Sequence, residues 1–251
     1  MWDKYVCSNA AKGGHFELLK WVRQKGCFWD RRTTAAAAEA GHIEMLKWVR
    51  ANGGRWSMKT CSKAARGGRL DVLKWLRANE CPWGKHVSRE AAKGGHIDML
   101  KWAKEAGAEI DFYDVTFGAA TKGHLEVLKW AKDQGEVMAD SLLCDVTAGA
   151  GKLDVLKWVL ENGCPSEPND ILADAIEGGH LHIVQWCYQQ GIGTFNNSVC
   201  SHAAAGGHIE MLKWLKDMGV PWKRKKVLKR AMRHNQVELL RWLFATETLY
   251  R

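Results

Sequence analysis

A tryptophan that returns every 27 or 28 residues constrains this chain more than any other feature. A turn, most often Gly-His, lies six residues before each copy, and a pair of small residues such as Ala64-Ala65 comes just before the turn. A period of this length is typical of a repeat protein, in which each copy is one supersecondary unit. The nine copies are Trp21, Trp48, Trp75, Trp102, Trp130, Trp158, Trp186, Trp214 and Trp242.

Each copy predicts two helices. The first spans about nine residues around the small pair and ends at glycine, which tolerates the left-handed conformation of a helix end. The second follows the turn, and its apolar side chains in the first copy are Phe16, Leu18, Leu19, Trp21 and Val22. At about 100° per residue they cover an arc of roughly 220°, wider than the stripe of a surface helix. We therefore expect an all-α solenoid, with the nine repeat tryptophans in its structural core.

The repeats follow one another without a linker, a low-complexity stretch or a change in composition, so we expect a single domain over 1–251. Five further tryptophans lie in the loops, where we expect them to pack over the joints between repeats: Trp2, Trp29, Trp56, Trp83 and Trp222. The expected repeats are approximately 1–26, 27–53, 54–80, 81–107, 108–135, 136–163, 164–191, 192–219 and 220–251.

The stretch Ala-Ala-Thr-Lys-Gly-His-Leu-Glu-Val-Leu-Lys-Trp, from Ala119 to Trp130, resembles the core of the ankyrin repeat. In its short period and many tryptophans the chain is similar to the ankyrin-like proteins of large DNA viruses and some protists. The usual ankyrin period is 33 residues. The missing residues fall between the glycine that ends the second helix and the next short helix, as in 26–33. The resemblance therefore implies an ankyrin-like solenoid of nine helix-turn-helix repeats with little or no β-hairpin.

The histidines and cysteines do not form a recognisable catalytic or metal-binding motif. Six of the ten histidines hold the same place at the turn, which favours a structural role. No Cys-x-x-Cys pair, phosphate loop or nucleophile elbow occurs in the sequence. Equivalent cysteines of successive copies would lie about 10 Å apart, beyond the ~7 Å limit for a disulfide. We expect free cysteines, no bound metal, no cofactor and no enzyme activity.

The net charge of +9 is unevenly distributed: +11 over 1–107, −9 over 108–191 and +7 over 192–251. A nucleic-acid duplex along the whole chain would meet a repulsive middle third, which disfavours that partner. The basic run from Lys223 to Lys226, with Lys229 and Arg230, fits a nuclear-import signal, a phosphate site or the polar face of a terminal cap, and we favour the cap. No stretch approaches the ~20 apolar residues of a membrane span, so we expect the cytoplasm or nucleus, or the host cytoplasm for a viral protein.

The resemblance implies a non-catalytic scaffold that binds another protein on the concave face formed by short helices and loops. Residues there that differ between copies are the expected contacts, and a partner with a minus-plus-minus charge pattern is the specific hypothesis. Two alternatives are binding of nucleic acid or an acidic surface through the basic terminal thirds, and end-to-end self-association through the uncapped N-terminal repeat. The expected contacts are Lys4, Tyr5, Arg31, Arg32, Lys59, Lys85, His86, Asp111, Tyr113, Asp114, Asp140, Glu167 and Asp170.

Overall fold

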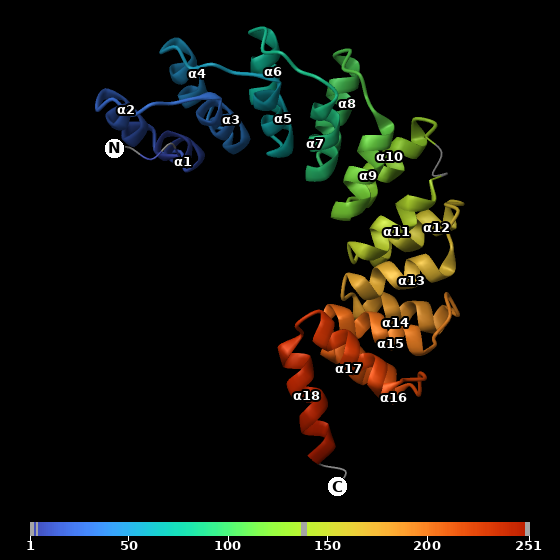
Figure 1. Cartoon of the computed structure of the whole chain (residues 1–251). Helices are drawn as coiled ribbons and strands as arrows, with labels where there is room; N and C mark the ends of the chain where they lie inside the picture. Colours follow the sequence, from blue (N-terminus) through green and yellow to red (C-terminus); the bar gives the residue numbers. More distant parts are fainter. Residues whose placement is uncertain (1–2, 4, 137–139, 249–251) are drawn as a thin grey trace. The chain divides into compact units, whose positions relative to one another are not determined.

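The chain folds into pairs of antiparallel helices joined by short loops, as a computed structural model shows (Figure 1). The structure describes residues 3, 5–136 and 140–248, with side chains to residue 245. Within these residues it has 18 helices and no strand. This confirms the predicted all-α repeat fold and the absence of a projecting β-hairpin from the described loops.

The first helix of each pair, expected to be short, spans 7 to 11 residues and is as long as most of the second helices, which span 9 to 12. We keep the name short helices for the first helices, which pack against one another in chain order within each unit. They are α1 (Val6–Lys12), α3 (Arg31–Ala40), α5 (Met58–Arg66), α7 (His86–Gly94), α9 (Phe112–Lys122), α11 (Ser141–Gly149), α13 (Pro168–Glu177), α15 (Asn197–Gly206) and α17 (Arg224–Arg233). The second helices are α2 (Phe16–Gln24), α4 (Ile43–Ala51), α6 (Leu70–Ala78), α8 (Ile97–Glu105), α10 (Leu125–Asp133), α12 (Leu153–Glu161), α14 (Leu181–Gln190), α16 (Ile209–Asp217) and α18 (Val237–Thr248).

The chain divides into two compact units, unit 1 (Met1–Glu136) with α1–α10 and unit 2 (Val137–Arg251) with α11–α18. The division falls at the expected border between the repeats 108–135 and 136–163. Both units are built from the same helix pair. The single domain over the whole chain remains a prediction.

Local sequence signals set the helix ends. Asp30 precedes α3, and its carboxylate accepts a hydrogen bond of 2.8 Å from the backbone N–H of Arg32, which satisfies one of the free donors of the first turn. Gly41 ends the same helix at φ 86°, a left-handed conformation that a side chain would strain. The next residue, His42, already starts the turn into α4. The two residues between α3 and α4, Gly41 and His42, therefore suffice to reverse the direction of the chain.

In most repeats the core contains a leucine of the second helix and the small pair of the first; the seventh repeat has Val184 in place of the leucine, and in the last repeat Met232 of the pair is exposed. Leu46 and Leu100, two residues before their tryptophans, are fully buried, as are Ala37 and Ala38 of α3. Burying a leucine side chain stabilises the fold by about 1.5–3 kcal/mol. The small residues allow successive short helices to approach one another closely.

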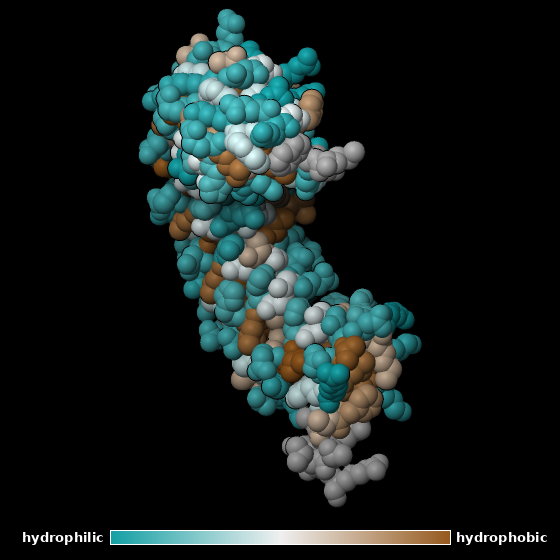
Figure 2. Space-filling model, turned by 90° about the vertical axis from the view of Figure 1, so that its left-hand side faces the viewer, coloured by the Kyte–Doolittle hydropathy of each residue, from teal (hydrophilic) through white to brown (hydrophobic). Residues whose placement is uncertain are grey.

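Hydrophilic residues cover most of the molecular face in Figure 2, with smaller apolar areas between them.

The repeat tryptophans are less buried than expected. Trp130 is 7% exposed, whereas Trp21 is 49% exposed and the other seven are half-buried. Their prediction as core residues is therefore wrong for Trp21 and too strong for the seven. The indoles lie at the edge of the apolar arc, where Trp48 meets the loop residue Trp29 edge-on at 5.4 Å between ring centroids.

The described loop tryptophans lie at the joints between repeats, as expected. Trp29 lies between Trp48 of its own repeat and the guanidinium of Arg23 from the preceding one, 4.4 Å from the ring centroid. Trp56 and Trp83 repeat this arrangement with the equivalent arginines. Each indole thus bridges two repeats by cation–π and edge-on contacts. Trp2 lies outside the described residues.

The cysteines are free and buried, but several of them lie in close pairs, among them Cys61 and Cys81, whose side chains form a hydrogen bond. The Sγ atoms of Cys7 and Cys27 are 3.1 Å apart, and those of Cys144 and Cys164 are 2.7 Å apart. The predicted separation of about 10 Å applied only to equivalent positions in successive repeats. It did not cover these pairs, in which the loop after a second helix, at the start of the next repeat, returns to the first helix of the preceding pair.

Candidate partner-binding surface

Each short helix carries one stripe of side chains that changes from copy to copy. The stripe consists of the residues 16, 13, 12 and 9 positions before the repeat tryptophan, which share one helix face because they are spaced i, i+3, i+4, i+7. The small pair, 11 and 10 positions before the tryptophan, faces the core instead, except for Met232 in the last repeat, which is exposed. We call these stripes the short-helix surface. At position −12 the copies carry Asn9, Ala36, Lys63, Glu90, Gly118, Val146, Asp174, His202 and Arg230.

In unit 1 a groove of about 660 Å³ lies across α3, α5 and α7, on the short-helix surface and the residues just before it at the helix starts. It brings together three of the predicted contacts, Arg31, Lys59 and His86. A smaller hollow of about 230 Å³ across α1, α3 and α5 adds Arg32 to Arg31 and Lys59. The groove of unit 1 is lined by Arg31, Ser57, Met58, Lys59, Ser62, Lys63, Arg66, His86 and Glu90.

Most cations further along these helices are neutralised within the unit. The Lys63 ammonium lies 2.9 Å from a carboxylate oxygen of Glu39. Arg66 lies between two acids, with its Nε 4.0 Å from Glu39 and 3.9 Å from Glu90. Arg31 and Lys59, in contrast, form no ion pair within the part of the chain that the structure describes. They lie beside Met58, which is 53% exposed, so the groove combines two uncompensated positive charges with an apolar contact.

The other predicted contacts at the start of unit 1 lie close to the groove or outside the described residues. Tyr5 is exposed, and the guanidinium of Arg32 stacks 5.1 Å from its ring centroid while pairing with Asp30. Lys85 precedes α7 at its N-cap. Lys4 is outside the described residues.

The predicted acidic contacts of unit 1 have structural partners. The Asp111 carboxylate accepts the backbone N–H of Asp114 at the start of α9. Asp114 also lies 3.6 Å from the Nε of Arg89. Tyr113 is exposed and stacks on Phe117 at 4.5 Å between centroids. These two carboxylates therefore stabilise α9 and its joint with α7.

In unit 2 the predicted acids lie at helix starts. Asp140 caps α11 by accepting the backbone N–H of Leu142 at 2.9 Å, Glu167 is the N-cap residue of α13, and Asp170 is in its first turn. None of the three lines the unit 2 cavities of about 320, 220 and 480 Å³.

Two further acids, Asp145 and Asp174, extend the negative charge along the short-helix surface of unit 2. Burial raises the pKa of both carboxyl groups, and neighbouring acids, including Asp170, raise it further. The Oδ1 atom of Asp145 is buried without a hydrogen-bond partner in the described residues. We call Asp145, Asp170 and Asp174 the α11/α13 acidic strip.

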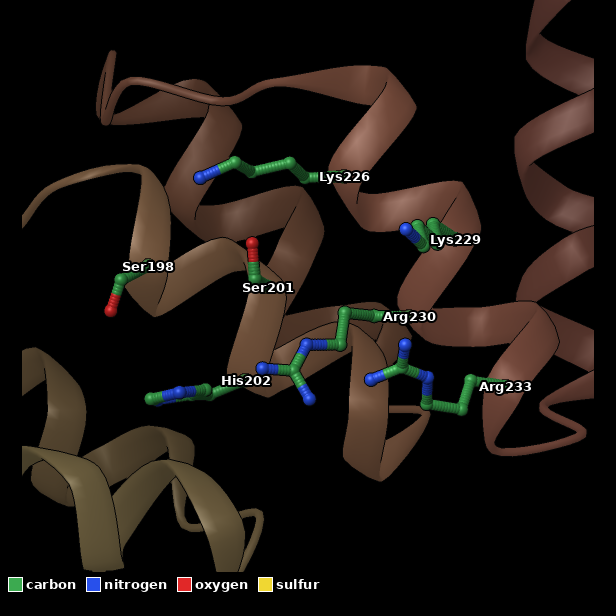
Figure 3. Close-up of a pocket in the computed structure, with 7 residues that line it drawn as sticks. All are labelled: Ser198, Ser201, His202, Lys226, Lys229, Arg230 and Arg233. Atoms are coloured by element: carbon green, nitrogen blue, oxygen red, sulfur yellow. The ribbon is translucent and has the colours of Figure 1, made fainter.

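Unit 2 also contains a cavity whose charge is opposite to that of the α11/α13 acidic strip. It measures about 320 Å³ and lies between α15 and α17, whose side chains extend into the same space (Figure 3). The sequence analysis favoured a terminal cap for this basic run and kept a phosphate site as an alternative, but it did not include Ser198, Ser201 or His202. Comparing copies by their distance from the repeat tryptophan indicates that His202 and Arg230 are neighbours, because both occupy the same repeat position, but it does not show the cavity. The pocket is lined by Ser198, Ser201, His202, Lys226, Lys229, Arg230 and Arg233.

The turn histidines are structural, as expected. The Nε2 atoms of His124 and His180 lie 3.0 and 2.9 Å from backbone carbonyl oxygens of Lys93 and Gly149, each at the end of the preceding short helix. Within the described residues no three or more His, Cys, Asp or Glu side chains form a cluster suited to a metal ion. Among the described helices, none combines the length and apolar character that a bilayer crossing requires.

Comparison with known proteins gives a fold likeness only. No protein-family model matches the chain. No curated protein matches it either. Among solved structures, the human ASB11 ankyrin repeat domain is similar over 74% of this chain and 83% of that chain, with 17% identity and a TM-score of 0.44. A similarity at this level carries no argument about partners, so the surface itself must indicate the function.

Proposed function

We propose that this chain is a non-catalytic scaffold that binds a partner protein on the short-helix surface and the adjoining loops. The observation that carries the proposal is the groove of unit 1. There Arg31 and Lys59 form no ion pair within the described residues and flank the exposed Met58. A scaffold without a partner has no need of copy-specific side chains on one face, because the repeat fold does not dictate them. The ankyrin resemblance of the sequence supports the same class of function.

The groove of unit 1 fits a protein segment that carries acidic and apolar side chains. Carboxylates would neutralise Arg31 and Lys59, and arginine can form two parallel hydrogen bonds to such a group. Methionine adapts its shape to an apolar neighbour because its side chain is unbranched and flexible. In unit 2 the acidic strip favours basic side chains of a partner instead.

The nucleic-acid alternative has less support. Lys63, Arg66 and Lys93 already pair with glutamates, so they would neutralise few phosphates. In unit 2 an extended polyanion along the short helices would meet the α11/α13 acidic strip. A generic duplex tests this directly, since binding through phosphates must weaken steeply between about 50 and 200 mM salt.

Charge reversal on the surface tests the proposal. The full chain is immobilised, and proteins captured from a cell lysate are identified by mass spectrometry. The variant carries Arg31→Glu, Arg32→Glu, Lys59→Glu and Lys85→Glu. Its matched control carries Lys47→Glu, Lys74→Glu, Lys101→Glu and Lys129→Glu, which produces the same change in net charge on the second helices of unit 1.

We expect specific capture by the wild-type chain and the control, and its loss from the variant. Capture that survives the variant unchanged would place the partner on another surface. A chain that captures nothing, or that loses its partner equally in both variants, contradicts the proposal. Circular dichroism must show that both variants keep their helix content.

End-to-end self-association remains a separate candidate because α2 exposes apolar side chains. Leu18 and Trp21 on this helix are about half exposed, and Phe28 follows it in the loop. Light scattering distinguishes the two ideas: a mass that grows with concentration, and that Leu18→Glu returns to that of a monomer, favours self-association. A constant monomer mass removes it.

A further inference from the structure

The geometry points to the pocket between α15 and α17 as a binding site for the phosphate group of a phosphorylated segment in a partner protein. The inference deepens the proposed function and rests on it, since the partner presents the phosphate. The site lies wholly within unit 2 and is separate from the groove of unit 1.

The positive charge of the pocket is not compensated by any residue that lines it. Lys226, Lys229, Arg230 and Arg233 line one cavity of about 320 Å³, and its lining contains no acidic residue. Within the described part of the chain none of the four forms an ion pair, unlike Lys63 of unit 1. Four cations around one small space repel one another unless an anion lies between them.

Hydrogen-bond donors reach the pocket from two helices. The cations project from α17, and α15 supplies the hydroxyl of Ser198 and the imidazole of His202 on the opposite side (Figure 3). Arg230 and His202 are half-buried, so their positions are restricted by packing. The pocket therefore has cations on its α17 side and polar side chains of α15 on the other side.

A phosphate monoester fits these donors better than a carboxylate does. Near pH 7 it carries a charge of about −1.5 to −2 and three strong acceptor oxygens, whereas a carboxylate carries one charge and two oxygens. The planar guanidinium of Arg230 or Arg233 can contact two phosphate oxygens at once, and the lysines add point charges. The volume of about 320 Å³ leaves room for the side chain that bears the phosphate.

The surroundings favour a single phosphate over a nucleic-acid strand. An adjoining cavity of about 480 Å³ shares His202 and Arg230 but also contains Glu177 from α13. Beyond it, Asp174 occupies on α13 the same repeat position as His202 on α15. Because successive short helices lie about 10 Å apart, a chain with a charge on every nucleotide would run onto these acids. A peptide with one phosphorylated residue would not.

Fluorescence anisotropy tests the inference with defined probes and the full chain. The probe is a short fluorescein-labelled peptide with one phosphoserine among neutral residues, and the comparison peptides carry serine or glutamate at that place. A single-stranded oligonucleotide and vesicles that contain a phosphoinositide are the other arms. The pocket variant is Arg230→Gln with Arg233→Gln, and the matched control is Lys213→Gln with Arg241→Gln on α16 and α18 of the same unit.

We expect saturable binding of the phosphoserine peptide, weaker by about tenfold or more for the serine peptide and for the pocket variant. The control variant should bind like the wild-type chain. Arg230→Lys should retain part of the affinity, because it keeps the charge but loses the planar guanidinium.

Three results would overturn the inference. These are equal binding of the serine and phosphoserine peptides, unchanged phosphopeptide binding by the folded pocket variant, or tighter pocket-dependent binding of the oligonucleotide or the vesicles. Failure here leaves the scaffold proposal standing if the unit 1 variant still loses its captured partner. The scaffold proposal is tested separately, by the charge-reversal variant of unit 1, which changes none of the residues of this pocket.

Discussion

Replacing His124 by alanine should destabilise the chain by about 2 kcal/mol, and the matched change at His42 by only about 1 kcal/mol. Both residues hold the same turn position, six residues before a repeat tryptophan, and both are half-buried. They differ in one contact. The His124 Nε2 lies 3.0 Å from the Lys93 carbonyl oxygen, whereas the His42 ring makes no hydrogen bond in the described residues.

The magnitude comes from two contributions. Each ring packs over a glycine of the preceding repeat, so closely that a Cβ on Gly95 would lie 2.6 Å from the His124 Nδ1, and one on Gly14 would lie 2.8 Å from the His42 Cε1. Loss of that packing costs about 1 kcal/mol in either variant. Only His124→Ala also loses a hydrogen bond that links two repeats, which contributes about another 1 kcal/mol.

The chain itself supplies the rescue variant. Gln236 holds the equivalent position in the last repeat, and its side-chain amide donates a hydrogen bond of 2.7 Å to the Ala205 carbonyl oxygen. Glutamine can therefore bridge two repeats in the same way. His124→Gln should remain within about 0.5 kcal/mol of the wild-type chain.

Urea unfolding followed by circular dichroism measures all three variants, with equal m-values required for the comparison. The reasoning is refuted if His42→Ala costs as much as His124→Ala. It is also refuted if glutamine at position 124 is no better than alanine, because a donor at this position would then contribute nothing.

Two further predictions concern pH. Asp145→Asn should raise the melting temperature at pH 7 by ~2–4 °C, because burial is the main cause of the raised pKa of this carboxyl group and the native state is penalised when the group ionises. The penalty appears as pH rises through the pKa, so the difference in melting temperature between the variant and the wild-type chain should shrink as pH is lowered. Burial raises the pKa of Cys187 and Cys200 to about 11, so native thiols keep protons that unfolded thiols lose near pH 8.5. The urea midpoint should therefore fall between about pH 9 and 11, and less steeply in Cys187→Ala with Cys200→Ala; equal slopes would contradict this.

The sequence by itself determined the repeat and its two helices. The returning tryptophan, the small pair and the Gly-His turn are local signals, and they fix the helix ends near residues such as Asp30 and Gly41 because caps and turns depend on neighbours in the chain. The burial of Leu46 and the small pair follows from the same periodicity. The turn role of the histidines was also predictable, although the sequence did not show that their partners are carbonyl groups of the preceding repeat.

Tertiary structure decided which surface residues meet. The groove that joins Arg31, Lys59 and His86 exists only because residues about 27 positions apart stack side by side in successive short helices. The pocket around Arg230, the exposure of Trp21 and the division into two units likewise depend on which neighbour covers each helix. Helical periodicity gives the direction of a side chain on its own helix, but the charge and the space facing it come from other repeats, and only their packing brings these together.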